Sequence, residues 1–212
     1  MDSPLMKKLG LLFDLMILNI LTILLSIPVV TAGAAITALY DAVWQLKHNR
    51  EGKLLRDYWN AFRANFKQST VLFLFLALFA LLLGYNVLLL IGGQEGMGLM
   101  VIPMALGAVV WLVIAAWVFP LQSRFQDKVG KTIINALLCG LRFLLRTTAM
   151  SVINLAPWVL LALVPETFFR LGLIWGFFWF GVTAYWNICL LDSPLKQLSG
   201  FDPDETREAE TN

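Results

Sequence analysis

The sequence predicts an all-α membrane protein, a helical bundle with about six membrane-crossing helices and two interfacial amphipathic helices. Of its 212 residues, 59% are hydrophobic and only 14% are charged, and the mean hydropathy is +0.75. A soluble domain usually has about 25% charged and roughly 45–50% apolar residues. Several runs also exceed the length of about 18 apolar residues that a spanning helix needs. The composition therefore excludes an ordinary soluble globular fold.

The first two spanning helices are expected on either side of a proline. Residues 5–27 form the first, which ends before Pro28 because proline lacks a backbone N–H and clashes with the preceding turn. After the small-residue turn at 29–35, the second helix has about 14 residues and a length of roughly 21 Å. A hydrocarbon core is about 30 Å thick. We therefore expect this short helix to cross while tilted or sheltered by its neighbours.

The segment LLRDYWNAFRANFK, residues 54–67, is too polar to span a bilayer and is expected to form a separate interfacial helix. Its apolar side chains recur at helical spacing, and polar and basic side chains follow one residue later. The apolar face is Leu55, Trp59, Phe62 and Phe66, and the basic edge is Arg56, Asn60, Arg63 and Lys67. An aromatic face beside a basic edge is typical of a helix that contacts lipid or a partner at the membrane interface.

The rest of the chain is expected to form two further helical pairs. Residues 69–90 and 99–121 flank the glycine-rich turn GGQEGMG, and residues 147–164 and 168–191 meet at Pro165-Glu166. A second interfacial helix is expected over residues 131–146, with one polar side formed by Lys131, Asn135, Arg142 and Arg146. Residues 1–198 are then one transmembrane domain. The acidic segment 199–212 is expected to be a disordered tail.

The distribution of basic residues predicts the orientation. If all the expected helices cross, every one of the 16 Lys and Arg residues except Arg170 lies on the side of the two termini. If the second helix does not cross, the basic residues at 47–67 lie opposite another basic segment. Because cytoplasmic loops carry an excess of Lys and Arg, we expect a multi-pass plasma-membrane protein with both termini in the cytoplasm.

Three segments suggest a family. They are SIPVVTAGAAITALY after the first helix, FRANFKQST at the start of the third and FPLQSRFQDKVGKTIINAL after the fourth. In this order they resemble the YesL-like bacterial integral membrane proteins, and the resemblance covers nearly the whole chain. Members of that family often accompany carbohydrate uptake systems of the ABC type in Gram-positive bacteria. The resemblance implies a role near sugar import and supplies no catalytic residues.

Asp41 is the most notable ionisable residue, because a carboxylate within a span costs at least about 2.5–3.5 kcal/mol on insertion scales. It shares a polar stripe of the second helix with Thr37 and Gln45. One interpretation is that this stripe lines a polar ligand or ion site. The other, which we favour, is that Asp41 lies near the cytoplasmic interface and pairs with a base such as Lys47 or Arg124.

The sequence contains no recognisable catalytic, metal or cofactor motif. His48 is the single histidine, and Cys139 and Cys189 lie far apart without CxxC spacing, so a soft-ligand metal site is not expected. No GxSxG, P-loop or GxGxxG sequence occurs. We therefore expect a non-enzymatic protein that needs no cofactor.

Three functions follow as hypotheses. The first is an accessory or regulatory component of a carbohydrate ABC-type uptake system, and the alternative is a small transporter or channel with a polar site near Asp41. A third, ranked below these two, is a lipid-modifying enzyme. Expected partners are the lipid bilayer and either the importer's membrane subunits or a second copy of this chain. Nucleic-acid binding is not expected, because the aromatic faces beside the basic residues should lie in lipid.

Overall fold

The computed structural model describes residues 4–48, 53–92, 99, 101–125, 127–170 and 172–199. Within this part of the chain the secondary structure is helical and includes no strand. The helices are α1 (Pro4–Ser26), the 3₁₀ helix η1 (Val29–Thr31), α2 (Ala32–Lys47), α3 (Leu54–Ile91), α4 (Val101–Arg124), α5 (Val129–Arg142), α6 (Leu144–Leu163), α7 (Pro165–Arg170) and α8 (Gly172–Ser199). The predicted all-α fold class is confirmed.

Five of the described helical segments are long and apolar enough to span a membrane. They are Lys8–Ser26, Val29–Lys47, Leu54–Ile91, Val101–Arg124 and Leu144–Leu163. The sixth expected span is α8, which is not among these five, although its 28 residues make it about 42 Å long. The chain is a polytopic membrane protein.

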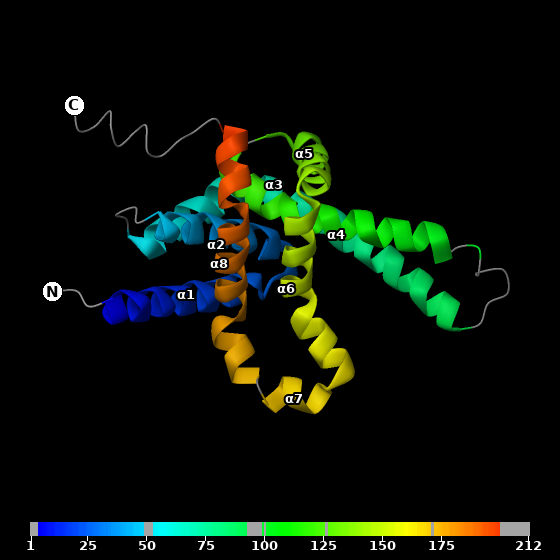
Figure 1. Ribbon diagram of the computed structural model, residues 1–212, viewed down its shortest axis with the longest axis horizontal. Helices are drawn as coiled ribbons and strands as arrows, with labels where there is room; N and C mark the ends of the chain where they lie inside the picture. The colour runs from blue at the N-terminus through cyan, green and yellow to red at the C-terminus, as the bar shows by residue number, and fades with distance from the viewer. Residues whose placement is uncertain are drawn as a thin grey trace.

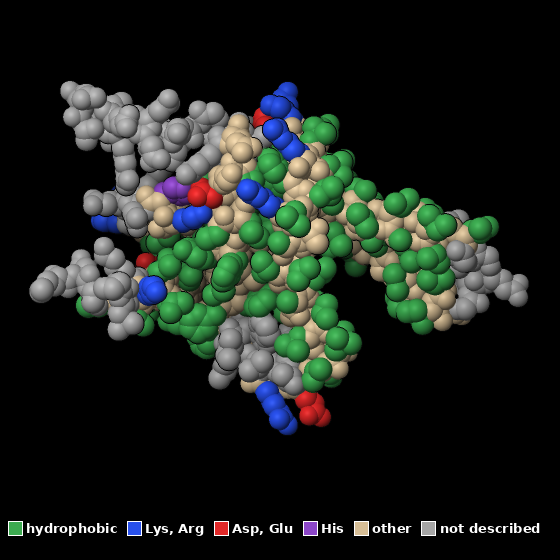
Figure 2. Space-filling model, in the orientation of Figure 1, with side chains coloured by type: hydrophobic (Ala, Val, Ile, Leu, Met, Phe, Trp, Pro, Cys, Tyr) green, Lys and Arg blue, Asp and Glu red, His purple; other side chains and the backbone are tan. Residues whose placement is uncertain are grey.

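The helices form two arms that leave a common centre in different directions (Figure 1). One arm is the α3–α4 hairpin, and the other is the α6–α8 hairpin, which α7 closes at its tip. Helix α5 lies where α4 leads into α6, away from α7. On the face shown in Figure 2, apolar side chains cover both arms, and most charged side chains gather around α5 and the nearby ends of α2 and α8.

Helix α2 is the most buried of the candidate spans and packs against α1, α3, α4 and α8. Its 16 residues give a length of about 24 Å, which is short of the hydrocarbon core. The buried positions are mostly small: Gly33, Ala34, Ala35, Thr37, Ala38, Leu39, Tyr40, Ala42, Val43 and Trp44. The short helix is therefore sheltered by its neighbours, which is one of the two arrangements expected from its length.

Glycines allow backbones to touch at two helix crossings. A Cβ atom on Gly33 would lie 2.2 Å from the carbonyl oxygen of Ser69, so α2 and α3 are in close contact there. A Cβ atom on Gly181 would lie 2.6 Å from the carbonyl oxygen of Leu15, where α8 crosses α1. The fully buried Asn19 completes this second crossing, because its Oδ1 accepts from the Gly181 N–H at 3.1 Å. Small residues are what permit such close approach between membrane helices.

The prediction of a separate interfacial helix at residues 54–67 is wrong. These residues are the first turns of α3, which continues without interruption to Ile91. The junction at Gln68, Ser69 and Thr70 contains no proline or glycine that would end a helix. Ser69 is also fully buried against α2, so packing holds the junction in helical form.

The segment of the second predicted interfacial helix is helical, as α5, but this helix ends earlier than expected. Phe143 leaves helical geometry at φ −115° and ψ 46°, so Arg146 belongs to α6. At the carboxyl end, Ser199 is the last residue of α8 instead of the first residue of a tail. The remainder of the predicted disordered tail, residues 200–212, lies outside the described residues.

Replacing Gly33 with alanine should destabilise the bundle by about 1–3 kcal/mol, the usual cost of overpacking, because the new methyl group meets the Ser69 carbonyl and the Phe73 side chain. Thermal unfolding of the purified protein in mild detergent measures this. Gly84→Ala is the matched control, since a Cβ at Gly84 has no neighbour within 4 Å. Equal melting temperatures for the two variants would contradict close contact between α2 and α3.

Candidate functional site

Asp41 on α2 forms an ion pair with Arg124, the last residue of α4. Arg124 Nη2 contacts Oδ1 of Asp41, and Gln45 Nε2 donates to Oδ2 at 2.7 Å. The guanidinium carbon of Arg124 also lies 5.2 Å from the centre of the Trp44 ring, within cation–π range. Only 16% of the Asp41 side chain and 18% of the Arg124 side chain are exposed. Asp41 is therefore paired with one of the two bases considered in the sequence.

A polar groove of about 300 Å³ lies beside this ion pair, where α2, α3 and α4 meet. Its lining is Asp41, Gln45, Asp57, Asn60, Ala61, Ala64, Asn65 and Ser123. Asp41 and Gln45 thus share one groove, as the polar-site hypothesis requires. Its volume is at the lower end of the range of about 300–1,000 Å³ that is usual for ligand sites.

Thr37, the third residue of the predicted polar site, lies apart from this groove. Its side chain is fully buried, with its hydroxyl 2.9 Å from the Gly33 carbonyl oxygen and 2.8 Å from Oγ of Ser69. The polar stripe of α2 therefore divides into two parts. Thr37 joins α2 to α3, while Asp41 and Gln45 border the groove.

A cluster of amides next to the groove connects three helices. Gln122 on α4 is almost fully buried, and its Nε2 lies 2.7 Å from Oε1 of Gln68 and 3.4 Å from Oδ1 of Asn65 on α3. Thr132 on α5 donates to Oε1 of Gln122 at 3.2 Å. Gln122 is not among the site residues predicted from the sequence. Its position as the first polar residue after the apolar run of α4 is the signal that could have found it.

The end of α2 is also joined to α8 through Asp192. Lys47 Nζ lies 2.9 Å from Oδ2 of Asp192, and His48 Nε2 lies 3.3 Å from Oδ1. The His48 ring stacks on Trp44 at 4.3 Å. Lys47, the other base considered for Asp41, is therefore engaged with a different carboxylate. The charged residues of α2 thus anchor it to α4 and α8.

The predicted interfacial residues of α3 lie on two sides of the helix. Phe62 is buried in the core, whereas Trp59 and Phe66 are 42% and 36% exposed. Arg63 and Lys67 are exposed, and the guanidinium carbon of Arg63 lies 5.1 Å from the centre of the Trp59 ring. We call Trp59, Arg63, Phe66 and Lys67 the α3 surface. The helix buries instead the side that contains Tyr58, Phe62, Asn65 and Ser69, about one residue away from the predicted apolar face.

The two predicted interfacial arginines after α4 have different surroundings. Arg146 donates to the Leu190 carbonyl oxygen on α8 at 3.0 Å. That carbonyl has no helical donor, because the residue four positions later is Pro194, which lacks an N–H. Arg142, the last residue of α5, is exposed and lies 5.4 Å from the centre of the Phe143 ring. Arg146 is therefore a structural link between α6 and α8.

Cys139 and Cys189 are both free thiols, and Cys139 is buried on α5. Burial raises the pKa of the Cys139 thiol, and the positive charge of Arg142 opposes this shift. A thiol with a raised pKa is a poor nucleophile at neutral pH. Across the described ranges, no three His, Cys, Asp or Glu side chains are grouped so that they could hold a metal ion.

The fold and the apolar helices place this chain in the class of all-α polytopic membrane proteins. Within that class, residues 15–87 match a family described as "Protein of unknown function, DUF624". The matched part runs from α1 to near the end of α3 and includes Asp41, Gln45 and the α3 surface. No curated protein and no solved structure matches the chain.

Asp41→Asn should lower the free energy of unfolding by about 3 kcal/mol, because it leaves the largely buried Arg124 without its carboxylate. Thermal or denaturant unfolding in detergent measures the loss. Asp57→Asn is the matched control, since Asp57 lines the same groove but has no ion-pair partner within the described residues. If both variants unfold alike, the Asp41–Arg124 pair does not stabilise the fold.

Proposed function

We propose that this protein is a non-enzymatic accessory or regulatory component of a carbohydrate uptake system of the ABC type in a bacterial plasma membrane. The match of residues 15–87 to DUF624 and the resemblance of three segments to YesL-like proteins support the assignment. The structural observation that carries it is the α3 surface, which exposes aromatic and basic side chains side by side.

The α3 surface has the composition of a protein-docking site. Trp and Arg are enriched among the residues that dominate binding energy at interfaces. Arg63 lies over Trp59, and Lys67 follows one turn later, so aromatic area and positive charge occur together. None of the ion pairs in the described part of the chain involves Arg63 or Lys67. A partner with an acidic rim around an apolar pocket would fit this surface.

A small transporter or channel is the second candidate, and the groove beside Asp41 favours it. Ionisable residues inside membrane proteins often mark substrate or ion paths. However, both carboxylate oxygens of Asp41 are engaged by Arg124 and Gln45, and Thr37 lies outside the groove. Transporter sites also usually lie near the bilayer midplane, between broken helices. A stable Asp41→Asn protein that fails to support growth on the relevant carbohydrate would favour this candidate.

Purification of the tagged protein in mild detergent, followed by mass spectrometry, tests the accessory function. We expect membrane subunits of an ABC importer to co-purify with the wild-type chain and to be reduced at least several-fold by Trp59→Ala or Arg63→Ala. Trp186→Ala and Arg170→Ala are matched controls, because both side chains are exposed and lie on other helices. Absence of importer subunits from the wild-type sample would remove the main support for this proposal.

The proposed orientation places α5 and both termini in the cytoplasm and α7 outside. Figure 1 shows α5 and α7 at opposite ends of the molecule. Arg170→Cys on α7 and Lys131→Cys on α5 should therefore differ in access to a membrane-impermeant thiol reagent, in a background without Cys139 and Cys189. We expect the first to react in intact cells and the second only after permeabilisation. The reverse pattern would invert the topology.

A further inference from the structure

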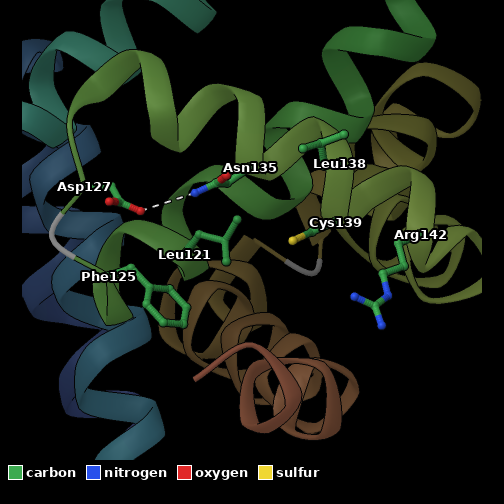
Figure 3. Close-up of a pocket in the computed structure, with 7 residues that line it drawn as sticks. All are labelled: Leu121, Phe125, Asp127, Asn135, Leu138, Cys139 and Arg142. Atoms are coloured by element: carbon green, nitrogen blue, oxygen red, sulfur yellow. Dashed lines mark hydrogen bonds between the residues drawn. The ribbon is translucent and has the colours of Figure 1, made fainter. Parts of the chain in front are cut away.

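A second groove, of about 360 Å³, lies between the end of α4 and α5 (Figure 3). Its lining is Leu121, Phe125, Asp127, Asn135, Leu138, Cys139 and Arg142. Figure 3 shows Asp127 and Phe125 at one end and Arg142 at the other, with Leu121 and Cys139 between them. The groove is therefore apolar in its middle and has one cation, Arg142, at one end.

The two charged residues of this groove differ in their partners. Asp127 accepts from Lys131 Nζ at 2.6 Å and from Asn135 Nδ2 at 3.2 Å, so its charge is already compensated within α5. Arg142 is exposed, and it takes part in none of the ion pairs found among the described residues. The groove therefore has a positive charge at one end that its own acid does not neutralise.

The outer side of α5 is apolar and faces away from the protein. Ile134, Leu138 and Leu141 are 60%, 59% and 52% exposed and lie at helical spacing along one side of α5. The buried side of α5 is formed by Thr132, Ala136, Cys139 and Gly140. In a membrane protein, such a helix lies with its apolar side in the acyl-chain boundary and its basic residues at headgroup level. Leu138 belongs to both the outer side and the groove, so the groove opens on the apolar outer side of α5.

We propose that the groove between α4 and α5 binds one anionic phospholipid from the surrounding bilayer. The phosphate is held by the Arg142 guanidinium, whose planar donors match a phosphate in a bidentate manner. One acyl chain passes Leu138 and lies against Leu121, Phe125 and Cys139. Asp127 does not repel the phosphate, because Lys131 and Asn135 already donate to the Asp127 carboxylate and compensate its charge. This site is separate from the α3 surface and does not depend on the proposed role in carbohydrate uptake.

Native mass spectrometry of the full chain in detergent tests the lipid site, with dioleoyl-phosphatidylglycerol and dioleoyl-phosphatidylcholine as probes. We expect the wild-type chain to bind the anionic lipid more tightly than the zwitterionic one. Arg142→Ala should weaken phosphatidylglycerol binding about fivefold, the usual contribution of one basic residue near an anionic membrane surface, and leave phosphatidylcholine binding unchanged. Arg142→Lys should retain most of the preference.

Two further variants separate the groove from general surface charge. Leu138→Trp should weaken binding of both lipids, because the larger side chain narrows the path of the acyl chain, and Arg170→Ala on α7 should change neither. An equal loss of phosphatidylglycerol for Arg142→Ala and Arg170→Ala would overturn the proposal. Displacement of the lipid by an equal concentration of inorganic phosphate would also overturn it, because it would show a simple anion site. Unchanged melting temperatures confirm that each variant is folded.

Discussion

The enclosure of α2 is the constraint on which the rest of the structure depends. A helix of 16 residues is too short to present its own apolar side chains to the whole hydrocarbon core. It is stable in this environment because α1, α3, α4 and α8 surround it closely. That closeness requires small side chains along α2, and at Gly33 it requires no side chain at all. Helix α2 thus sets the distances between the helices that surround it, and the two long arms project from this centre.

Polar interactions between helices hold the same centre together. The Asp41–Arg124 pair joins α2 to α4, Lys47 and His48 join α2 to Asp192 on α8, and Gln122 joins α4 to α3. Each of these groups would be costly to bury alone, and each finds a partner on another helix. The ionisable and amide side chains of this centre are therefore engaged in contacts that join helices. For this reason the exposed surfaces of α3 and α5 are the stronger functional candidates.

Composition and periodicity were sufficient to predict the helical class, the break at Pro28, the short second helix and a base opposite Asp41. These features depend on local patterns or on the cost of an unpaired charge. The continuity of α3 could not be predicted, because the polar residues Gln68 and Ser69 resemble a helix end unless their partners Gln122 and Thr37 are known. The burial of Phe62 was missed for a similar reason. The spacing of residues along a helix gives the angle between their side chains around the helix axis. It does not show which side of the helix is buried by another helix.

The unbroken course of α3 has a mechanical consequence. Its 38 residues give a length along the helix axis of about 57 Å, which is longer than the roughly 40–45 Å of a whole bilayer including headgroups. Its helical hydrogen bonding continues from Leu54 to Ile91, so the turns around Trp59 and the tip of the α3–α4 arm belong to one continuous helix. A tilt of the turns around Trp59 would therefore also move the tip of the α3–α4 arm.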